Sequence, residues 1–298
     1  MAVDPKHNKN IIICPNVEND AGLKMTILVL ETLQKLSRTT VICPLFDDNR
    51  ARSFIGIGFG GFEQEPRISK LEDELSESEM IITLGGDGTI LRAARIAADS
   101  GIPILGFNMG GKGFMAELET GDSELLGVAA SGKYELEKRM MLDVEVVRDT
   151  QTVYSGFALN DVVVKGDNKV IDLTLFGDGQ RISRFSGDGV IIATPTGSTA
   201  YSMAAGGPIV EPTAHNIIIT PICAHILDAK SFVLEPDRKV SVEIGWRKHN
   251  PAYISVDGSD RVVLMDNDRV VVRKSEKTTR LVHLKERSFY EKVSEKLG

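Results

Sequence analysis

The sequence predicts an α/β N-terminal domain with a parallel, Rossmann-like sheet, followed by an all-β C-terminal domain of antiparallel, sandwich-like form. Up to about residue 135, short apolar runs alternate with segments of helical spacing, which is typical of a parallel sheet. Over residues 136–275, short alternating runs follow one another with turn residues between them, which indicates an antiparallel sheet. A chain of 298 residues is long enough for two such domains, each with its own core.

The first part of the chain begins with a β-branched run, Ile11–Cys14, that ends at Pro15. Leu23–Leu36 follows, with apolar residues at helical spacing on one side. The same rules predict strands over 39–45, 80–84 and 102–107 and a helix over 90–99. Residues 49–66 are rich in Gly and Arg and lack periodicity, so we expect a long loop. The tail, from about residue 276 to 298, ends in an amphipathic helix over 289–297, and we expect it to pack back on residues 1–135.

The second part of the chain consists of short strands separated by turn residues. The expected strands are residues 144–147, 157–165, 171–176, 182–186, 190–193, 217–220, 239–244, 252–256 and 269–274. Gly177-Asp178-Gly179 lies between two of these strands with no helix after it. Asp-Gly favours tight hairpin turns, so we expect a hairpin there.

Composition and charge exclude several classes of function. Apolar residues make up 42% and charged residues 26% of the chain, as in ordinary globular proteins. The formal net charge of −7 argues against nucleic acid or an anionic membrane as a partner. The N-terminus is polar and has no apolar signal segment, and no apolar run is long enough for a membrane span, so we expect a cytoplasmic protein. Three widely spaced cysteines are expected to be small, buried residues in a reducing compartment.

A glycine-rich motif, Gly85-Gly86-Asp87-Gly88-Thr89, follows the apolar strand and precedes a helix. Its glycines allow close approach of a ligand, and Thr89 is expected to cap the helix, whose N-terminus attracts phosphate. Asp87 would repel a phosphate, so it suits a general base on a hydroxyl or a partner of Mg²⁺. Arg92, one turn on, faces either a phosphate donor or solvent. A tight turn without function is the alternative, and the spacing matches neither common phosphate-binding glycine motif.

A second motif, Gly187-Asp188-Gly189, leads through an apolar strand into a hydroxyl-rich loop, Thr194–Thr199. A helix is expected to start at Ala200 and to break at Gly206. Hydroxyls and the ring of Tyr201 suit a ribose, an adenine edge or a phosphate, whereas the alternative is an ordinary Ser/Thr turn. Together the two motifs predict a kinase that acts on a nucleotide hydroxyl.

Both motifs resemble the signatures of the NAD kinase family, and the second does so nearly letter for letter. The segment Asn108–Phe114 is similar to the family's Asn-Leu-Gly-x-Leu-Gly-Phe, and Asn160-Asp161 aligns with an Asn-Glu pair. Pro221–His225 and Asp257-Gly258 also match family segments, so the resemblance covers about residues 81–258.

This resemblance implies an enzyme that phosphorylates the adenosine 2′-hydroxyl of NAD⁺ to give NADP⁺. ATP or polyphosphate is the implied donor. Mg²⁺ or another divalent cation is implied to arrive with the nucleotide phosphates rather than in a protein cage. Residues 1–135 would form the nucleotide-binding domain and residues 136–275 the NAD-binding domain. A homodimer or homotetramer is implied as well.

The resemblance also implies a role for each matching residue. Asp87 would be the catalytic carboxylate. The residues around the donor phosphate would be Gly85, Gly86, Gly88, Thr89 and Arg92. The NAD-binding residues would be Gly88, Phe114, Asn160, Asp161, Asp188, Thr199, Ala200, Tyr201 and Asp257.

Three positions depart from the family pattern. Lys112 replaces an apolar residue, Asp161 is one methylene shorter than the family's Glu, and Ala224 replaces a proline. Two other functions share part of the pattern: a diacylglycerol- or sphingosine-type lipid kinase, which has the first motif alone, and a non-catalytic NAD(P)-binding sensor. A sugar kinase of the 6-phosphofructokinase type likewise shares only the first motif.

Overall fold

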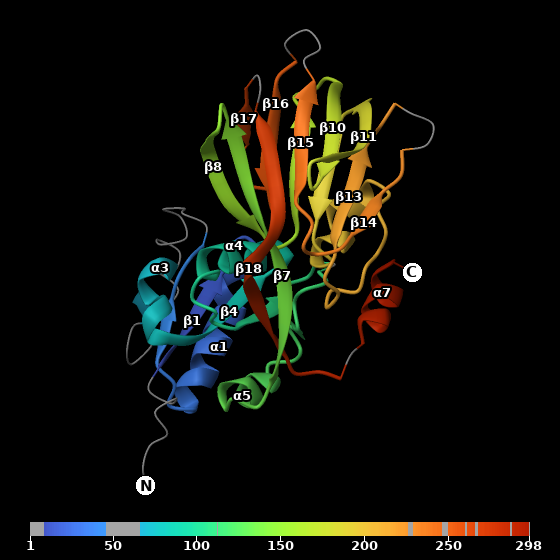
Figure 1. Ribbon diagram of the computed structural model, residues 1–298. Coiled ribbons are helices and arrows are strands. Elements are labelled where there is room, and N and C mark those ends of the chain that lie inside the picture. Colours follow the sequence, from blue (N-terminus) through green and yellow to red (C-terminus); the bar gives the residue numbers. More distant parts are fainter. Residues whose placement is uncertain are drawn as a thin grey trace. The chain divides into compact units, whose positions relative to one another are not determined.

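The computed structural model describes residues 9–45, 66–111, 113–225, 229–245, 250–259, 261–265, 268–286 and 288–297 (Figure 1). Lys112 and all of the expected loop over 49–66 except Pro66 lie outside these ranges. The chain divides into two compact units: residues 1–138 with 279–298, and residues 139–278. Within the described ranges, no helix is both long and apolar enough to cross a membrane.

The first unit contains a parallel sheet with the strand order β5-β4-β1-β2-β3. Its strands are β1 (Asn10–Pro15), β2 (Thr40–Ile42), β3 (Arg67–Ile68), β4 (Ser78–Gly85) and β5 (Ile104–Asn108), and β6 (Leu118–Glu119) also pairs with β5. The apolar residues of β1 are fully buried, as expected for a parallel strand covered on both faces. The predicted parallel sheet is therefore confirmed.

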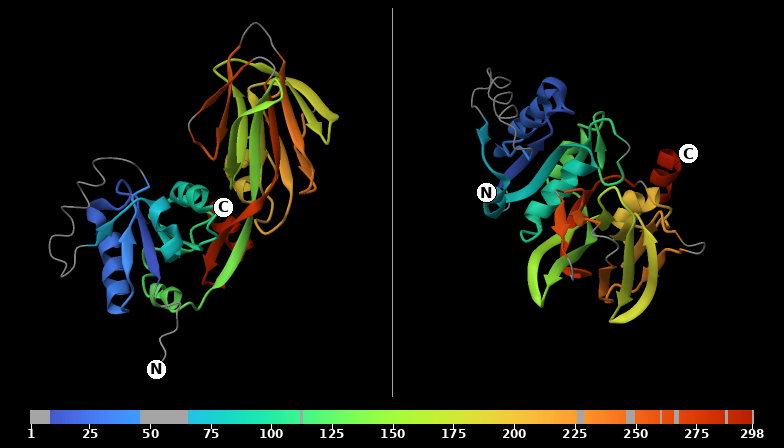
Figure 2. Two further views of the ribbon diagram at one scale, coloured as in Figure 1. Left: turned by 60° about the vertical axis from the view of Figure 1, so that its left-hand side comes forward. Right: turned by 90° about the horizontal axis from the view of Figure 1, so that it is seen from above.

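Helices cover both faces of this sheet (Figure 2). α1 (Lys24–Lys35) and α5 (Leu125–Ala130) share one apolar cluster with alternate residues of β1, β4 and β5. α4 (Asp87–Ala97) packs on the other face, where Ile90 lies against Gly106. The short α3 (Leu71–Glu74) contacts α4, and α7 (Phe289–Leu297) forms the C-terminal helix. Short 3₁₀ turns, η2 (Ala21–Leu23) and η3 (Leu75–Glu77), precede α1 and follow α3.

The second unit contains two antiparallel sheets. The order of the first is β11-β10-β15-β18-β7-β8, and the order of the second is β14-β13-β12-β9-β16-β17. Strands of the first sheet are β7 (Glu135–Arg148), β8 (Gln151–Ala158), β10 (Ile171–Gly177), β11 (Gln180–Gly187), β15 (Val240–Gly245) and β18 (Arg269–His283). Residues 135–138 of β7 and 279–283 of β18 belong to the first unit, where Leu281 pairs in parallel with Ile104 of β5. Strands of the second are β9 (Asp161–Gly166), β12 (Gly189–Ala193), β13 (Ile217–Ile222), β14 (Phe232–Leu234), β16 (Ala252–Val256) and β17 (Val262–Leu264). The predicted antiparallel all-β fold is confirmed.

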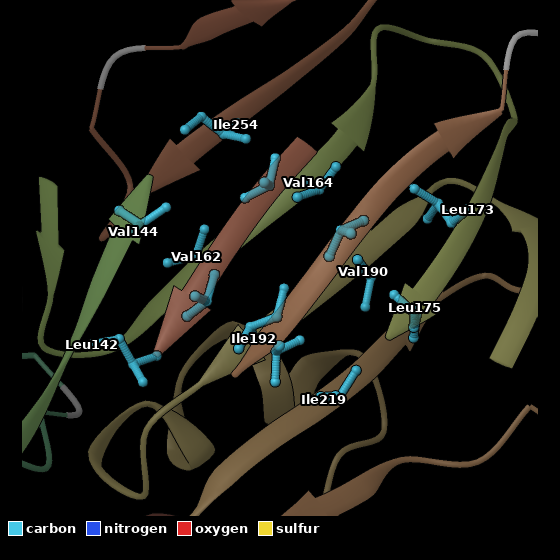
Figure 3. Packing of buried hydrophobic residues seen from close by; sticks show 14 of the residues in the cluster. Leu142, Val144, Val162, Val164, Leu173, Leu175, Val190, Ile192, Ile219 and Ile254 are labelled. Carbon is cyan, nitrogen blue, oxygen red and sulfur yellow. The ribbon is translucent and has the colours of Figure 1, made fainter. Parts of the chain in front are cut away.

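Apolar side chains from both sheets form one core in the second unit (Figure 3). Leu142 and Leu173 come from the first sheet, and Val162, Ile192 and Ile254 come from the second. Because side chains of a strand alternate between faces, every second residue of these strands is buried between the sheets. This packing of the two inner faces explains the alternating pattern of the sequence.

Several boundaries differ from the sequence prediction for identifiable reasons. The single strand expected over 157–165 is wrong, because the chain turns at Leu159-Asn160 between β8 and β9. The helix expected to start at Ile90 starts at Asp87, with Gly86 as its N-cap and no side-chain cap. The hairpin at Gly177-Asp178-Gly179 is confirmed, since Asp178 and Gly179 have φ values of 49° and 81° and join β10 to β11.

The three cysteines are free. Cys14 and Cys43 are buried as expected, and burial is the main reason that the pKa of Cys14 is raised and that the pKa of Cys43 reaches about 12. Their thiols are therefore protonated and unreactive at neutral pH. The same expectation is wrong for Cys223, which is exposed and has a left-handed backbone with φ of 46° just after β13.

Candidate active site

The first group of candidate residues lies in the first unit, at the carboxyl end of β4. β4 ends at Gly85 and α4 begins at Asp87, so the turn between them contains only Gly86. The carbonyl of Gly85 accepts a hydrogen bond from the N–H of Met109 at 3.0 Å, which ties the turn to the end of β5. Ligands of parallel α/β sheets bind at this edge, because strand ends and helix N-termini meet there.

The Asp87 carboxylate is fixed by a segment that follows β5. Its Oδ2 accepts the N–H of Phe114 at 2.7 Å, and its Oδ1 accepts the N–H of Met115 at 3.1 Å. A Cβ atom at Gly113 would overlap Oδ1, so only glycine allows this close approach. An ionised carboxylate has about four acceptor positions, and these two bonds leave Asp87 able to accept a hydroxyl. The side chain is half-buried and thus open to a ligand.

The glycines of the first motif differ in what requires them. A Cβ at Gly85 would overlap the hydroxyl of Thr89, so the fold itself requires glycine there. A Cβ added at Gly86 or Gly88 would have no atom of the described residues within 4 Å, and neither residue has a positive φ. The backbone at these two positions faces open space, which leaves it accessible to an anion.

Thr89 and Arg92 lie further along α4. Thr89 is 2% exposed, and its hydroxyl has no hydrogen-bond partner among the described residues. The expected capping role of Thr89 is wrong, because its hydroxyl is buried against Gly85 instead of capping the helix. Arg92 is half-buried on the second turn of α4.

The second group of candidate residues lies in the second unit, where the chain turns from β8 into β9. The Asp257 carboxylate accepts the N–H groups of Leu159 at 2.7 Å, Asn160 at 2.7 Å and Asp161 at 3.0 Å. The N–H of Asp257 in turn donates to the carbonyl of Asp161 at 3.0 Å. The Asp257 carboxylate thus holds this turn through charge-assisted hydrogen bonds. The backbone of Asp257 itself is left-handed, with φ of 48°.

Asn160 and Asp161 are buried polar residues whose side chains suit a ligand. Asn160 is 8% exposed, and its Oδ1 has no partner among the described residues, although buried acceptors are normally paired. Burial, with a smaller effect from the charge of Asp257, raises the pKa of Asp161 to about 7. The turn therefore presents an amide oxygen that lacks a donor beside a carboxyl that titrates near neutral pH.

The hydroxyl-rich loop forms η4 (Thr196–Thr199) and α6 (Tyr201–Ala204), and most of its hydroxyls are structural. Thr194 Oγ1 donates to the carbonyl of Leu159 at 2.6 Å, and Ser198 Oγ donates to the carbonyl of Pro195 at 2.7 Å. A Cβ at Gly197 would overlap the carbonyl of Asn160, so the loop packs directly on the Asn160 turn. Only the end of the loop is accessible: Thr199 and Ala200 are half-buried, and Tyr201 is exposed.

Lys165 belongs to the accessible part of this region and was missed in the sequence analysis. Its Nζ lies 3.5 Å from the Tyr201 hydroxyl. Desolvation lowers the pKa of Lys165, but the bond to Tyr201 and the charges of Tyr201, Tyr253 and Asp188 outweigh it and raise the pKa overall. Lys165 therefore joins Tyr201 and Asp188 into one polar cluster. In the sequence, Lys165 is marked only by its place as a basic residue directly after the apolar run Val162–Val164.

The candidate residues thus fall into two groups, one in each unit. The structure brings Asp87 together with Phe114, and it brings Asn160 together with Asp161, Asp257 and the Thr194–Thr199 loop. The first unit holds Gly85, Gly86, Asp87, Gly88, Thr89, Arg92 and Phe114, and the second holds Asn160, Asp161, Asp188, Thr199, Ala200, Tyr201 and Asp257. In the part of the chain that the structure describes, no three His, Cys, Asp or Glu side chains are grouped to hold a metal ion.

Two family models match this chain. The model described as the ATP-NAD kinase N-terminal domain matches residues 63–126, and that of the ATP-NAD kinase C-terminal domain matches residues 159–284. A NAD kinase from Natranaerobius thermophilus is 43% identical over 294 residues, which cover 97% of this chain and 98% of the relative. A NAD kinase from Ruminiclostridium cellulolyticum is 32% identical over 292 residues, which cover 97% of this chain and 98% of that relative.

The chain belongs to the NAD kinase family. It is an enzyme that phosphorylates NAD, as the sequence analysis expected, and the lipid-kinase and sensor alternatives are not favoured. Among solved structures, a NAD kinase from Archaeoglobus fulgidus in complex with ATP has a TM-score of 0.72 at 26% identity, with 97% of this chain and 98% of that chain covered. A yeast NADH kinase complexed with NADH has a TM-score of 0.87 at 24% identity, with 99% of this chain and 89% of that chain covered, and so shares the fold.

Gly113→Ala should reduce NAD kinase activity because the new methyl group displaces the Asp87 carboxylate. We expect kcat to fall by about ten- to a hundredfold, the size of effect seen when catalytic groups move by about 1 Å. Gly111→Ala is the matched control, since the nearest atom to its Cβ is Asn108 Oδ1 at 3.9 Å. Steady-state kinetics and melting temperatures of both variants test this. Equal activity of the two variants would contradict it.

Asp161→Asn should change how stability depends on pH. The folded chain holds the Asp161 proton up to about pH 7 because its pKa is raised, whereas the unfolded chain loses it near pH 4. Between these values the folded state binds more protons, so this group lowers the free energy of unfolding as pH rises. Relative to the parent, the variant should gain on the order of 2–3 kcal/mol between pH 5 and pH 8 in urea titrations.

Asp178→Asn serves as the control for this pH effect. A backbone hydrogen bond from Lys239, together with Arg238, lowers the pKa of Asp178, so the window of its contribution lies below pH 5. Its stability relative to the parent should be constant from pH 5 to pH 8. A constant difference for Asp161→Asn as well would show that Asp161 is ionised throughout this range.

Proposed function

We propose that the enzyme transfers the terminal phosphoryl group of ATP to the 2′-hydroxyl of the adenosine ribose of NAD⁺, giving NADP⁺ and ADP. The observation that carries this proposal is the Asp87 carboxylate, fixed by two N–H groups beside the open backbone of Gly86 and Gly88. A ribose hydroxyl is a poor nucleophile at neutral pH, so a carboxylate that orients it and accepts its proton accelerates transfer.

On the acceptor side, we assign the adenosine half of NAD⁺ to the Asn160 turn. The unpaired Oδ1 of Asn160 is a suitable acceptor for the exocyclic amine of adenine, and Asp161 is a suitable partner for the adenosine. Phe114 supplies an aromatic face, and Asp257 acts through the turn that it shapes. Thr199, Ala200 and Tyr201 supply the accessible end of the hydroxyl-rich loop, and Asp188 with Lys165 extends it towards the nicotinamide half.

On the donor side, we assign the phosphates of ATP to the start of α4. The N–H groups of Thr89 and Ile90 already donate to the carbonyl of Gly86, so the contacts fall to Gly86, Gly88 and Arg92. Gly85 and the buried Thr89 support the turn rather than touch the donor. The Archaeoglobus fulgidus NAD kinase in complex with ATP supports ATP as donor, and polyphosphate offers the same phosphate chemistry.

Mg²⁺ or another divalent cation is proposed to enter with the donor phosphates. The described residues contain no cluster of three metal-ligating side chains, which suits an ion held mainly by phosphate and water, with Asp87 as the carboxylate at the turn. The bound ion would neutralise charge on the transferred phosphoryl group. Alignment of the hydroxyl and acceptance of its proton remain the work of Asp87.

Three further expectations are retained as proposals. The nucleotide-binding domain is assigned to residues 1–135 with the tail, and the NAD-binding domain to residues 136–275. A cytoplasmic location is supported by the free cysteines, since reducing compartments keep thiols unpaired. Assembly as a homodimer or homotetramer can be checked by the mass of the particle in solution.

Asp87→Asn tests the central assignment. The variant keeps a hydrogen-bonding side chain at the turn but loses the base, so kcat should fall by about a hundred- to ten-thousandfold while NAD⁺ binding changes little. Asp178→Asn is a matched control, because this aspartate also lies between two glycines but serves only a hairpin. Activity of Asp87→Asn within about tenfold of the parent would sink the assignment.

Gly88→Ala tests the donor site separately. An alanine at the second position of α4 meets no described atom and suits a helix better than glycine, so the fold should gain up to about 1 kcal/mol. The methyl group would instead collide with a phosphate that approaches the backbone, and the KM for ATP should rise by about tenfold or more. Gly121→Ala, which is equally open but lies outside the motif, is the control. An unchanged KM for ATP would move the donor elsewhere.

A further inference from the structure

The C-terminal segment is bound to a buried carboxylate, Glu117, which lies outside both glycine motifs. Glu117 is 7% exposed, and its Oε1 accepts the N–H groups of Leu284 at 2.9 Å and Lys285 at 2.7 Å. Its Oε2 lies 3.2 Å from His283 Nδ1 and 3.5 Å from Lys292 Nζ. A single side chain thus binds the end of β18, the loop after it and α7, all within the first unit.

Glu117 stands three residues after the Phe114 N–H that binds Asp87. Its own N–H donates to the carbonyl of Gly106 in β5 at 3.1 Å, so this end of the segment is also fixed to the sheet. At the other end, the Lys296 Nζ of α7 lies 5.3 Å from the centre of the Phe114 ring, within the range of a cation–π contact. The C-terminal segment therefore contacts residues 114–117 at both ends.

This arrangement links the tail of the chain to the catalytic carboxylate by short, specific contacts. Only three peptide units separate Phe114 from Glu117, and consecutive Cα atoms are about 3.8 Å apart, so a shift at one end of this short segment is transmitted to the other. Loss of the Glu117 side chain would leave the N–H groups of Leu284 and Lys285 without their acceptor. Of the described contacts between the tail and residues 114–117, the one between Lys296 and Phe114 would remain. The N–H groups of Phe114 and Met115 would then be held at Asp87 less firmly, with the backbone bond from Glu117 to Gly106 as the remaining anchor on the sheet.

We propose that Glu117 is a positioning residue for phosphoryl transfer: by binding residues 283–285 and Lys292 of the C-terminal segment, it helps to fix the two N–H groups that orient the Asp87 carboxylate. This inference rests on the proposed function, in which Asp87 is the catalytic carboxylate. Glu117 touches neither substrate in this scheme, so its main effect appears in kcat. The KM for NAD⁺ should change little, because the Phe114 ring keeps its contact with Lys296.

A double-mutant cycle on the full-length enzyme tests the proposal. Glu117→Ala should lower kcat by about ten- to a hundredfold with the KM for NAD⁺ within about threefold. Glu117→Gln should lose less, because its amide oxygen still accepts the N–H groups of Leu284 and Lys285. In the Asp87→Asn background, measured by single turnover at high enzyme concentration, Glu117→Ala should cause no further loss, since the group that it positions is already absent.

Glu74→Ala provides the matched control. Glu74 is likewise a buried carboxylate of the first unit, 3% exposed, and its hydrogen-bond partners are Arg67 and Ser69, neither of which belongs to residues 114–117 or to the C-terminal segment. Its loss should lower the melting temperature but leave kcat within about threefold when assayed well below that temperature. An effect that came from general destabilisation would appear in both variants, whereas the proposed positioning effect appears only in Glu117→Ala.

Three results would overturn the proposal: Glu117→Ala with kcat within threefold of the parent, an equal loss from Glu74→Ala, or the same fold-loss in the presence and absence of the Asp87 carboxylate. In each case a large effect of Asp87→Asn would leave the proposed function intact. A small effect of Asp87→Asn would instead remove both. If Glu117→Ala does not fold, the cycle with Glu117→Gln decides. A loss of kcat that disappears in the Asp87→Asn background supports the proposal, whereas no loss, or the same fold-loss in both backgrounds, overturns it.

Discussion

Carboxylates that accept backbone N–H groups from distant segments are the interaction on which both halves of the candidate site depend. Asp87 binds the N–H groups of Phe114 and Met115, and Asp257 binds those of residues 159–161. Each such contact satisfies two or three donors at once, and leaving a buried donor unpaired costs about 1–3 kcal/mol. The turns that carry the site are therefore shaped by charge-assisted hydrogen bonds rather than by apolar packing.

The number of acceptor positions that each carboxylate uses within the chain separates their functions. An ionised carboxylate can accept about four hydrogen bonds. Asp87 uses two on the chain and keeps capacity for a substrate hydroxyl, whereas Asp257 uses three on one turn. Asp178, which like Asp87 lies between two glycines, accepts from Lys239 and Arg238 and stabilises a hairpin. The same Gly-Asp-Gly sequence therefore belongs to the candidate active site at Asp87 and to a hairpin at Asp178, because different donors bind the two carboxylates.

A similar distinction separates the glycines and hydroxyls of the two motifs. Gly85, Gly113 and Gly197 are required by neighbouring atoms of the chain, whereas Gly86 and Gly88 face open space. Thr194 and Ser198 use their hydroxyls to build the loop, which leaves its accessible surface to Thr199, Ala200 and Tyr201. Many residues of these motifs are therefore needed to pack and hold the turns. Only the remaining ones are available to contact a ligand.

The sequence by itself determined the two kinds of sheet, the strand–glycine–helix turn at Asp87 and the family, because periodicity and local backbone preferences are properties of neighbouring residues. It could not show that one expected strand breaks at Leu159-Asn160, since the break depends on Asp257, almost a hundred residues away. Nor could it select Glu117 or Lys165, whose neighbours in the sequence form no recognisable motif. Only the tertiary structure decided these positions, because hydrogen bonds and burial between remote segments leave no trace in the local pattern of residues.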